Sequence, residues 1–81
     1  MGKEQHWRDR ARQLYRVAQS ELQDKWSGEQ QGEASFFKEE LEEALLDLKQ
    51  AVIDDREDDA TTYEAEVMRN LIELRDLWEN R

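Results

Sequence analysis

The side chains with most potential for chemistry in this sequence are carboxylates, and they are concentrated in the middle of the chain. Residues 29–66 contain 14 Asp or Glu against three Lys or Arg, a net charge of −11. Residues 1–28 carry +2 and residues 67–81 are neutral, so the whole chain carries −9. A strongly acidic surface attracts basic partners and repels phosphate groups. The charge therefore predicts a protein partner with a basic surface, and it disfavours direct binding to nucleic acid or to an anionic membrane.

The densest part of this acidic segment is a run of six residues, all but one of them carboxylates. These carboxylates are Asp54, Asp55, Glu57, Asp58 and Asp59. A calcium-binding loop can be aligned with the run if Asp55 takes its first position and Glu66 its twelfth. Ala60 then occupies the sixth position, where the sharp turn of such a loop needs glycine. We therefore interpret the run as a docking patch for a basic partner or a solvated turn, and we predict no metal or cofactor.

The basic side chains of the first segment form a ridge. Arg8, Arg12 and Arg16 are spaced four residues apart, which places them on one face of a helix. Guanidinium groups bind carboxylates and phosphates in the same bidentate manner. We expect this ridge to pair with acidic side chains of a second helix or of a second subunit, with plain solvation or phosphate contact as the alternatives.

Catalysis is not predicted. A nucleophilic serine needs a neighbouring base, and the only histidine, His6, lies close to the start of the chain. Di-iron helical bundles combine inward glutamates with Glu-x-x-His motifs, and the sequence contains no such motif. The chain also has no cysteine, so it offers neither disulfides nor thiolate metal ligands. These observations favour binding over enzymatic function.

The elements that must position these groups are helices. The chain contains no proline, and its three glycines leave two long stretches without a helix breaker. Apolar residues recur three and four positions apart, which predicts helices over 4–27, 35–55 and 61–80. We expect Gly28 to cap the first helix in a left-handed conformation and Ser35 to cap the start of the second.

A break is expected between the second and third helices at residues 56–61. Carboxylates at the end of a helix are disfavoured by its dipole, and Thr61 with Glu64 offers a capping box for a new helix. One continuous helix over 35–80 remains the alternative. It would place Asp55 and Asp59 on a buried seam, so we prefer the break.

The expected fold is all-α, a small bundle of about three helices forming a single domain over residues 1–81. Four apolar side chains lie off the main helical stripes: Leu46, Ile53, Met68 and Ile72. A monomeric three-helix bundle needs one apolar face per helix, so a second stripe predicts another helix packing from outside. The three tryptophans fall on or beside the main stripes and are expected in the core.

These features predict a small acidic interaction module without enzymatic activity, an adaptor, inhibitor or regulator that acts by stoichiometric binding. A homodimer is expected. Two alternatives stay open: a nucleic-acid mimic that blocks a nucleic-acid-binding protein, and a structural homo-oligomer. The sequence contains no signal peptide or membrane-spanning segment, so we expect a cytoplasmic protein.

Overall fold

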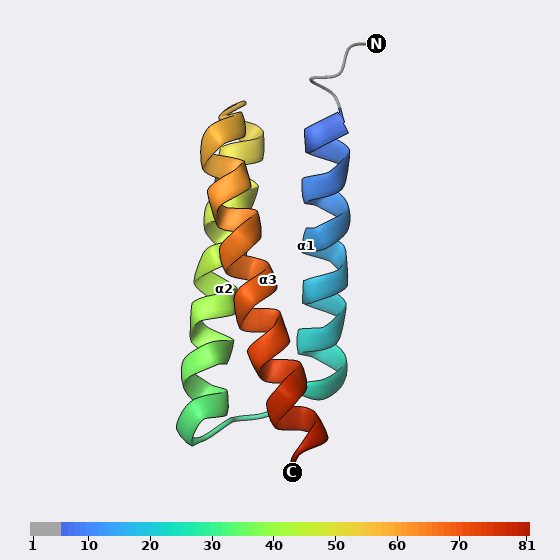
Figure 1. Ribbon diagram of the computed structural model, residues 1–81, viewed down its shortest axis with the longest axis vertical. Helices are drawn as coiled ribbons and strands as arrows, with labels where there is room; N and C mark the ends of the chain where they lie inside the picture. Colours follow the sequence, from blue (N-terminus) through green and yellow to red (C-terminus); the bar gives the residue numbers. More distant parts are fainter. Residues whose placement is uncertain (1–5) are drawn as a thin grey trace.

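The computed structural model describes residues 6–81, which form three long helices packed side by side (Figure 1). The helices are α1 (His6–Lys25), α2 (Gly32–Ile53) and α3 (Glu57–Glu79), and the described part contains no strand. The bundle measures 45 × 17 × 16 Å. In Figure 1 the chain runs down α1, up α2 and down α3, so α1 is parallel to α3 and antiparallel to α2. This confirms the all-α three-helix prediction and shows that a continuous helix over 35–80 is wrong.

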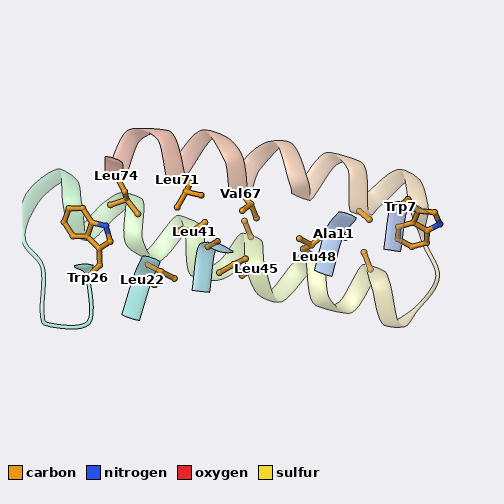
Figure 2. Packing of buried hydrophobic residues seen from close by; sticks show 14 residues of the cluster. Trp7, Ala11, Leu22, Trp26, Leu41, Leu45, Leu48, Val67, Leu71 and Leu74 are labelled. Atoms are coloured by element: carbon orange, nitrogen blue, oxygen red, sulfur yellow. The ribbon is translucent and has the colours of Figure 1, made fainter. Parts of the chain in front are cut away.

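The core runs the whole length of the bundle between the three helices, as Figure 2 shows. Its largest fully buried side chains are Leu41, Leu48, Val67, Leu71 and Leu74. Each fully buried side chain of this size contributes about 1.5–3 kcal/mol relative to an exposed one. All of these residues belong to the apolar helical stripes that the sequence predicts. None of the helices in residues 6–81 is long and apolar enough to cross a membrane.

Tryptophans close the two ends of this core. Trp7 and Trp26 lie at opposite ends of the cluster, and each is 5% exposed. Trp26 packs edge-on against Trp78 of α3, with ring centroids 5.4 Å apart and planes at 74°. The predicted core position of the tryptophans is thus confirmed for Trp7 and Trp26, and Trp78 is half-buried. Phe36, at the start of α2, is mostly exposed.

The turn between α2 and α3 lies earlier than predicted and has a different mechanism. Asp55 adopts a left-handed conformation (φ 59°) directly after Asp54, the C-cap of α2. Its N–H donates to the carbonyl of Val52 (3.3 Å), and the N–H of Arg56 donates to that of Ala51 (2.9 Å). This pair of hydrogen bonds is the Schellman motif, in which a left-handed residue, usually glycine, satisfies the last carbonyls of a helix.

Helix α3 begins at Glu57, four residues before the predicted start. Thr61 is not an N-cap, because its hydroxyl lies inside the helix and donates to the carbonyl of Glu57 (3.1 Å). The physical reason is that Glu57, Asp58 and Asp59 occupy the first turn of α3, where the positive end of the helix dipole favours carboxylates. The second half of the acidic run therefore starts α3, whereas Asp54 and Asp55 end α2.

The connection between α1 and α2 also departs from the prediction. Gly28 is not in a left-handed conformation, whereas Gly32 is (φ 65°) and begins α2. Ser35 lies within α2, its hydroxyl 3.5 Å from the carboxylate of Glu39, so it is not the N-cap. Helix α1 ends at Lys25 and α2 begins at Gly32, so the connection spans residues 26–31 instead of the predicted 28–34, and its left-handed residue lies at the start of α2.

Candidate interaction surface

Two exposed apolar stripes flank α1 on opposite sides. The α2 stripe consists of Leu46 and Ile53, which are 64% and 63% exposed, and the α3 stripe of Met68 and Ile72, which are 43% and 55% exposed. The spacing of the sequence predicted that all four would lie off the core. From their spacing alone these four residues form a single group, whereas in the structure the α2 stripe and the α3 stripe lie on different sides of α1. Leu46 and Ile53 line hollows between α1 and α2, and Met68 lines one between α1 and α3.

The side of the bundle between α1 and α2 holds two adjoining hollows, which we call the α1–α2 groove. Their volumes are about 590 and 300 Å³, and Tyr15 lines both. The smaller hollow is lined by the whole predicted basic ridge and by Lys49, beside Val52 and Ile53. Among the described residues, Glu42 is the only carboxylate that lines either hollow. An acidic protein thus presents one groove whose charged side chains are mostly basic.

The basic side chains of this groove differ in how far they are neutralised. Arg8 is tied to the end of α2, because its guanidinium donates to the carbonyl of Val52 (3.0 Å) and pairs with Asp55 (2.7 Å). Arg12 pairs with the exposed carboxylate of Asp9, at 3.6 Å. Arg16 and Lys49 form no ion pair within residues 6–81. Within the ridge, Arg8 therefore joins α1 to the end of α2, whereas Arg16 at the other end has no ion-pair partner among residues 6–81.

Sequence reasoning missed Lys49, although the sequence contains a signal for it. The residues three and four positions away on both sides are apolar, namely Leu45, Leu46, Val52 and Ile53. No carboxylate on α2 can therefore reach Lys49 by the usual helical spacing. Arg16 likewise has no carboxylate three or four positions away on α1, where the corresponding neighbours are Arg12, Gln13, Gln19 and Ser20.

The acidic run is largely occupied by local contacts. Arg56 pairs with Asp54 (3.5 Å) and Asp59 (2.7 Å), and Arg8 pairs with Asp55. Glu57 and Asp58 stay exposed in the first turn of α3. Since residues from 57 onwards are helical, the run does not form a calcium-binding loop, and residues 6–81 contain no group of three His, Asp or Glu that could hold a metal. The run offers a partner fewer free carboxylates than its sequence indicates.

Two ion pairs fix α1 against α3. Arg10 donates from Nε and Nη2 to both carboxylate oxygens of Glu64 (3.2 and 3.1 Å), and Arg75 binds both oxygens of Glu21. The sequence separation is the same in both pairs, 54 residues, because α1 and α3 run parallel. The polarity is opposite in the two pairs, which lie 11 residues apart on each helix, so a shift of one helix by that length would place Arg10 beside Arg75 or Glu21 beside Glu64. The hydrogen bonds from Arg75 hold the pKa of Glu21 below its ordinary value of 4.5.

Comparison of the chain with protein-family models, curated proteins and solved structures found no match. The inference of function therefore depends on the surfaces described above. These surfaces are apolar side chains exposed on a filled bundle, a basic groove on one side of α1, and an ion-paired face on the other.

Proposed function

We propose that this protein is a small acidic interaction module without enzymatic activity, which acts by stoichiometric binding to another protein as an adaptor, inhibitor or regulator. The observation that supports this proposal is the exposure of the α2 and α3 stripes. The core is already filled by one face of each helix, so these four side chains contribute nothing to it. Exposed apolar side chains that recur on one face of a helix are typical of surfaces that receive another protein.

The α3 stripe is the surface that best fits a different protein with a basic rim. Met68 and Ile72 are one helical turn apart, and Asp76 and Glu79 continue the same face four and seven residues beyond Ile72. All four side chains are exposed. On the α1 side the patch is bordered by Arg10 and Arg75, which are already paired with Glu64 and Glu21. Asp76 and Glu79 form no ion pair within residues 6–81, so they suit a partner with an apolar groove edged by Lys or Arg, and the net charge of −9 accelerates its association.

The proposal is tested by capture from an extract of the native host. The bait carrying Met68→Lys and Ile72→Lys is compared with the unmodified protein and with Phe36→Lys, a matched change at an exposed aromatic residue outside both stripes. We expect one protein to be retained in fixed stoichiometry by the unmodified and Phe36 baits and lost with the double variant. A set of captured proteins that is the same for all three baits would contradict the assignment of the α3 stripe.

The salt dependence separates this function from nucleic-acid mimicry. Charge–charge contacts between exposed groups are strongly screened at about 0.5 M salt, whereas apolar contacts persist. We expect the captured partner to stay bound at that concentration. A nucleic-acid-binding partner that is released by salt and by added DNA would instead favour the mimic.

A further inference from the structure

The α2 stripe has flanks of opposite charge. At about 100° per residue, Glu39, Glu43 and Asp47 lie on the side of the stripe that faces away from α1. Lys49 lies on the other side, next to the α1–α2 groove, where Arg12 pairs only with the exposed Asp9 of its own helix and Arg16 forms no ion pair within residues 6–81. The acidic residues are spaced four apart on α2, which matches the spacing of the arginine ridge on α1. The chain therefore carries, next to one apolar stripe, both a basic groove and an acidic row of matching period.

We propose that a second copy of this chain occupies the α1–α2 groove, and that the two copies pack with their α2 helices parallel. Leu46 then contacts Leu46 of the second copy, and Ile53 contacts its counterpart. The acidic row of each α2 lies against the basic groove of the other subunit. The surface differs from the α3 stripe assigned to a different protein, so this inference and the proposed function can fail separately.

The direction of the helices follows from symmetry. A two-fold axis parallel to α2 turns the acidic flank of one helix towards the basic flank of the other, on both sides of the seam. A two-fold axis perpendicular to α2 would give antiparallel helices and bring acidic flank against acidic flank. Because like charges across an interface are repulsive, only the parallel arrangement is complementary.

The height of the charged groups along the bundle agrees with this arrangement. Arg12 and Arg16 line the same hollow as Leu48, Lys49 and Val52, so they lie beside the second half of α2. In a parallel pair in register, Asp47 and Glu43 of the second copy lie at or next to this level. The apolar lining of the groove and the carboxylate of Glu42 within it favour a helix as the occupant over a nucleic-acid strand, which the net charge also repels.

The first experiment measures molecular mass by sedimentation equilibrium, with helicity followed by circular dichroism. We expect the unmodified protein to be dimeric at high micromolar concentration. Leu46→Glu with Ile53→Glu should give a helical monomer, whereas the matched control Met68→Glu with Ile72→Glu should remain dimeric. A monomeric unmodified protein, or a dimer lost only in the control, would overturn the proposal.

The second experiment exchanges the charges. One variant carries Arg12→Glu and Arg16→Glu, and the other carries Glu43→Lys and Asp47→Lys. Each alone places like charges on both sides of its own interface and should be monomeric, whereas an equimolar mixture has opposite charges on both sides and should form a heterodimer. If both variants dimerise alone as strongly as the unmodified protein, the charged flanks do not face each other.

The third experiment determines direction, and the absence of cysteine from the natural chain removes competing disulfides. Leu46→Cys alone should form an intermolecular disulfide if the helices are parallel, because the substituted position then meets itself. In an antiparallel pair that joins Leu46 to Ile53, the two substituted positions would be separated by seven residues, about 10 Å of helix, beyond disulfide reach. Cross-linking only in a mixture of Leu46→Cys with Ile53→Cys would show that the parallel arrangement is wrong.

Discussion

Asp55 holds the turn between α2 and α3 in a left-handed conformation that few residues other than glycine adopt. Its backbone closes the Schellman motif, and its carboxylate, 72% exposed, pairs with Arg8 of α1. The residue therefore combines two separable contributions, one from its backbone and one from its charge. Three substitutions distinguish them: Asp55→Asn, Asp55→Gly and Asp55→Ala.

The magnitudes follow from the geometry. An exposed ion pair is worth about 0–1 kcal/mol, and the left-handed conformation costs an alanine about 1 kcal/mol or more, whereas asparagine tolerates it and glycine adopts it freely. Asp55→Asn should therefore reduce the free energy of unfolding by about 0.5 kcal/mol. Asp55→Gly should change it little, because relief of the backbone offsets the lost pair and the greater freedom of the unfolded chain. Asp55→Ala loses both contributions, about 1–2 kcal/mol.

Urea unfolding followed by circular dichroism at pH 7 measures these differences in the free energy of unfolding. In thermal unfolding, the Tm should fall by about 4–8 °C for each kcal/mol of lost stability in a domain of this size. The unmodified protein and the glycine variant should be the most stable, followed by the asparagine variant and then by the alanine variant. An alanine variant as stable as the glycine variant would show that the left-handed conformation is not maintained in solution. Added salt should reduce the difference in unfolding free energy between the unmodified protein and the asparagine variant, because it screens the ion pair. The difference between the glycine and alanine variants should not change, because neither contains the pair.

Three further predictions concern the rest of the bundle. Since the folded-state pKa of Glu21 is depressed, its stabilising effect is present above its unfolded pKa and is lost as pH falls through the folded value. Arg75→Gln should thus lower the Tm at pH 7 and have less effect at about pH 3, and a pH-independent difference would contradict this. Leu48→Ala should cost about 2–5 kcal/mol in urea unfolding, because the side chain is fully buried; a loss below about 1 kcal/mol would mean that the core is loosely packed there. Gly32→Ala should cost about 1 kcal/mol from its positive φ alone, since a Cβ meets no atom there, whereas Gly28→Ala should be neutral; equal effects would refute this account.

The sequence by itself determined the helices and their faces. The 3.6-residue periodicity is a local property, so the apolar residues of each segment specify which side of a helix is buried before its neighbours are known. For the same reason the exposure of Leu46, Ile53, Met68 and Ile72 was predicted correctly. The helix ends were predicted less well, because cap preferences are weak and the acidic run is compatible with either the end of one helix or the start of the next.

Only the tertiary structure decided which surfaces these faces form. The pairs of Arg10 with Glu64 and of Glu21 with Arg75 join residues 54 positions apart, a distance at which no helical spacing rule applies. The basic groove exists because α1 packs with its arginine ridge towards α2, and the two apolar stripes are separate because α1 lies between them. The order and direction in which three amphipathic helices pack depend on contacts between residues distant in sequence, and the periodicity of each helix is the same for every such arrangement.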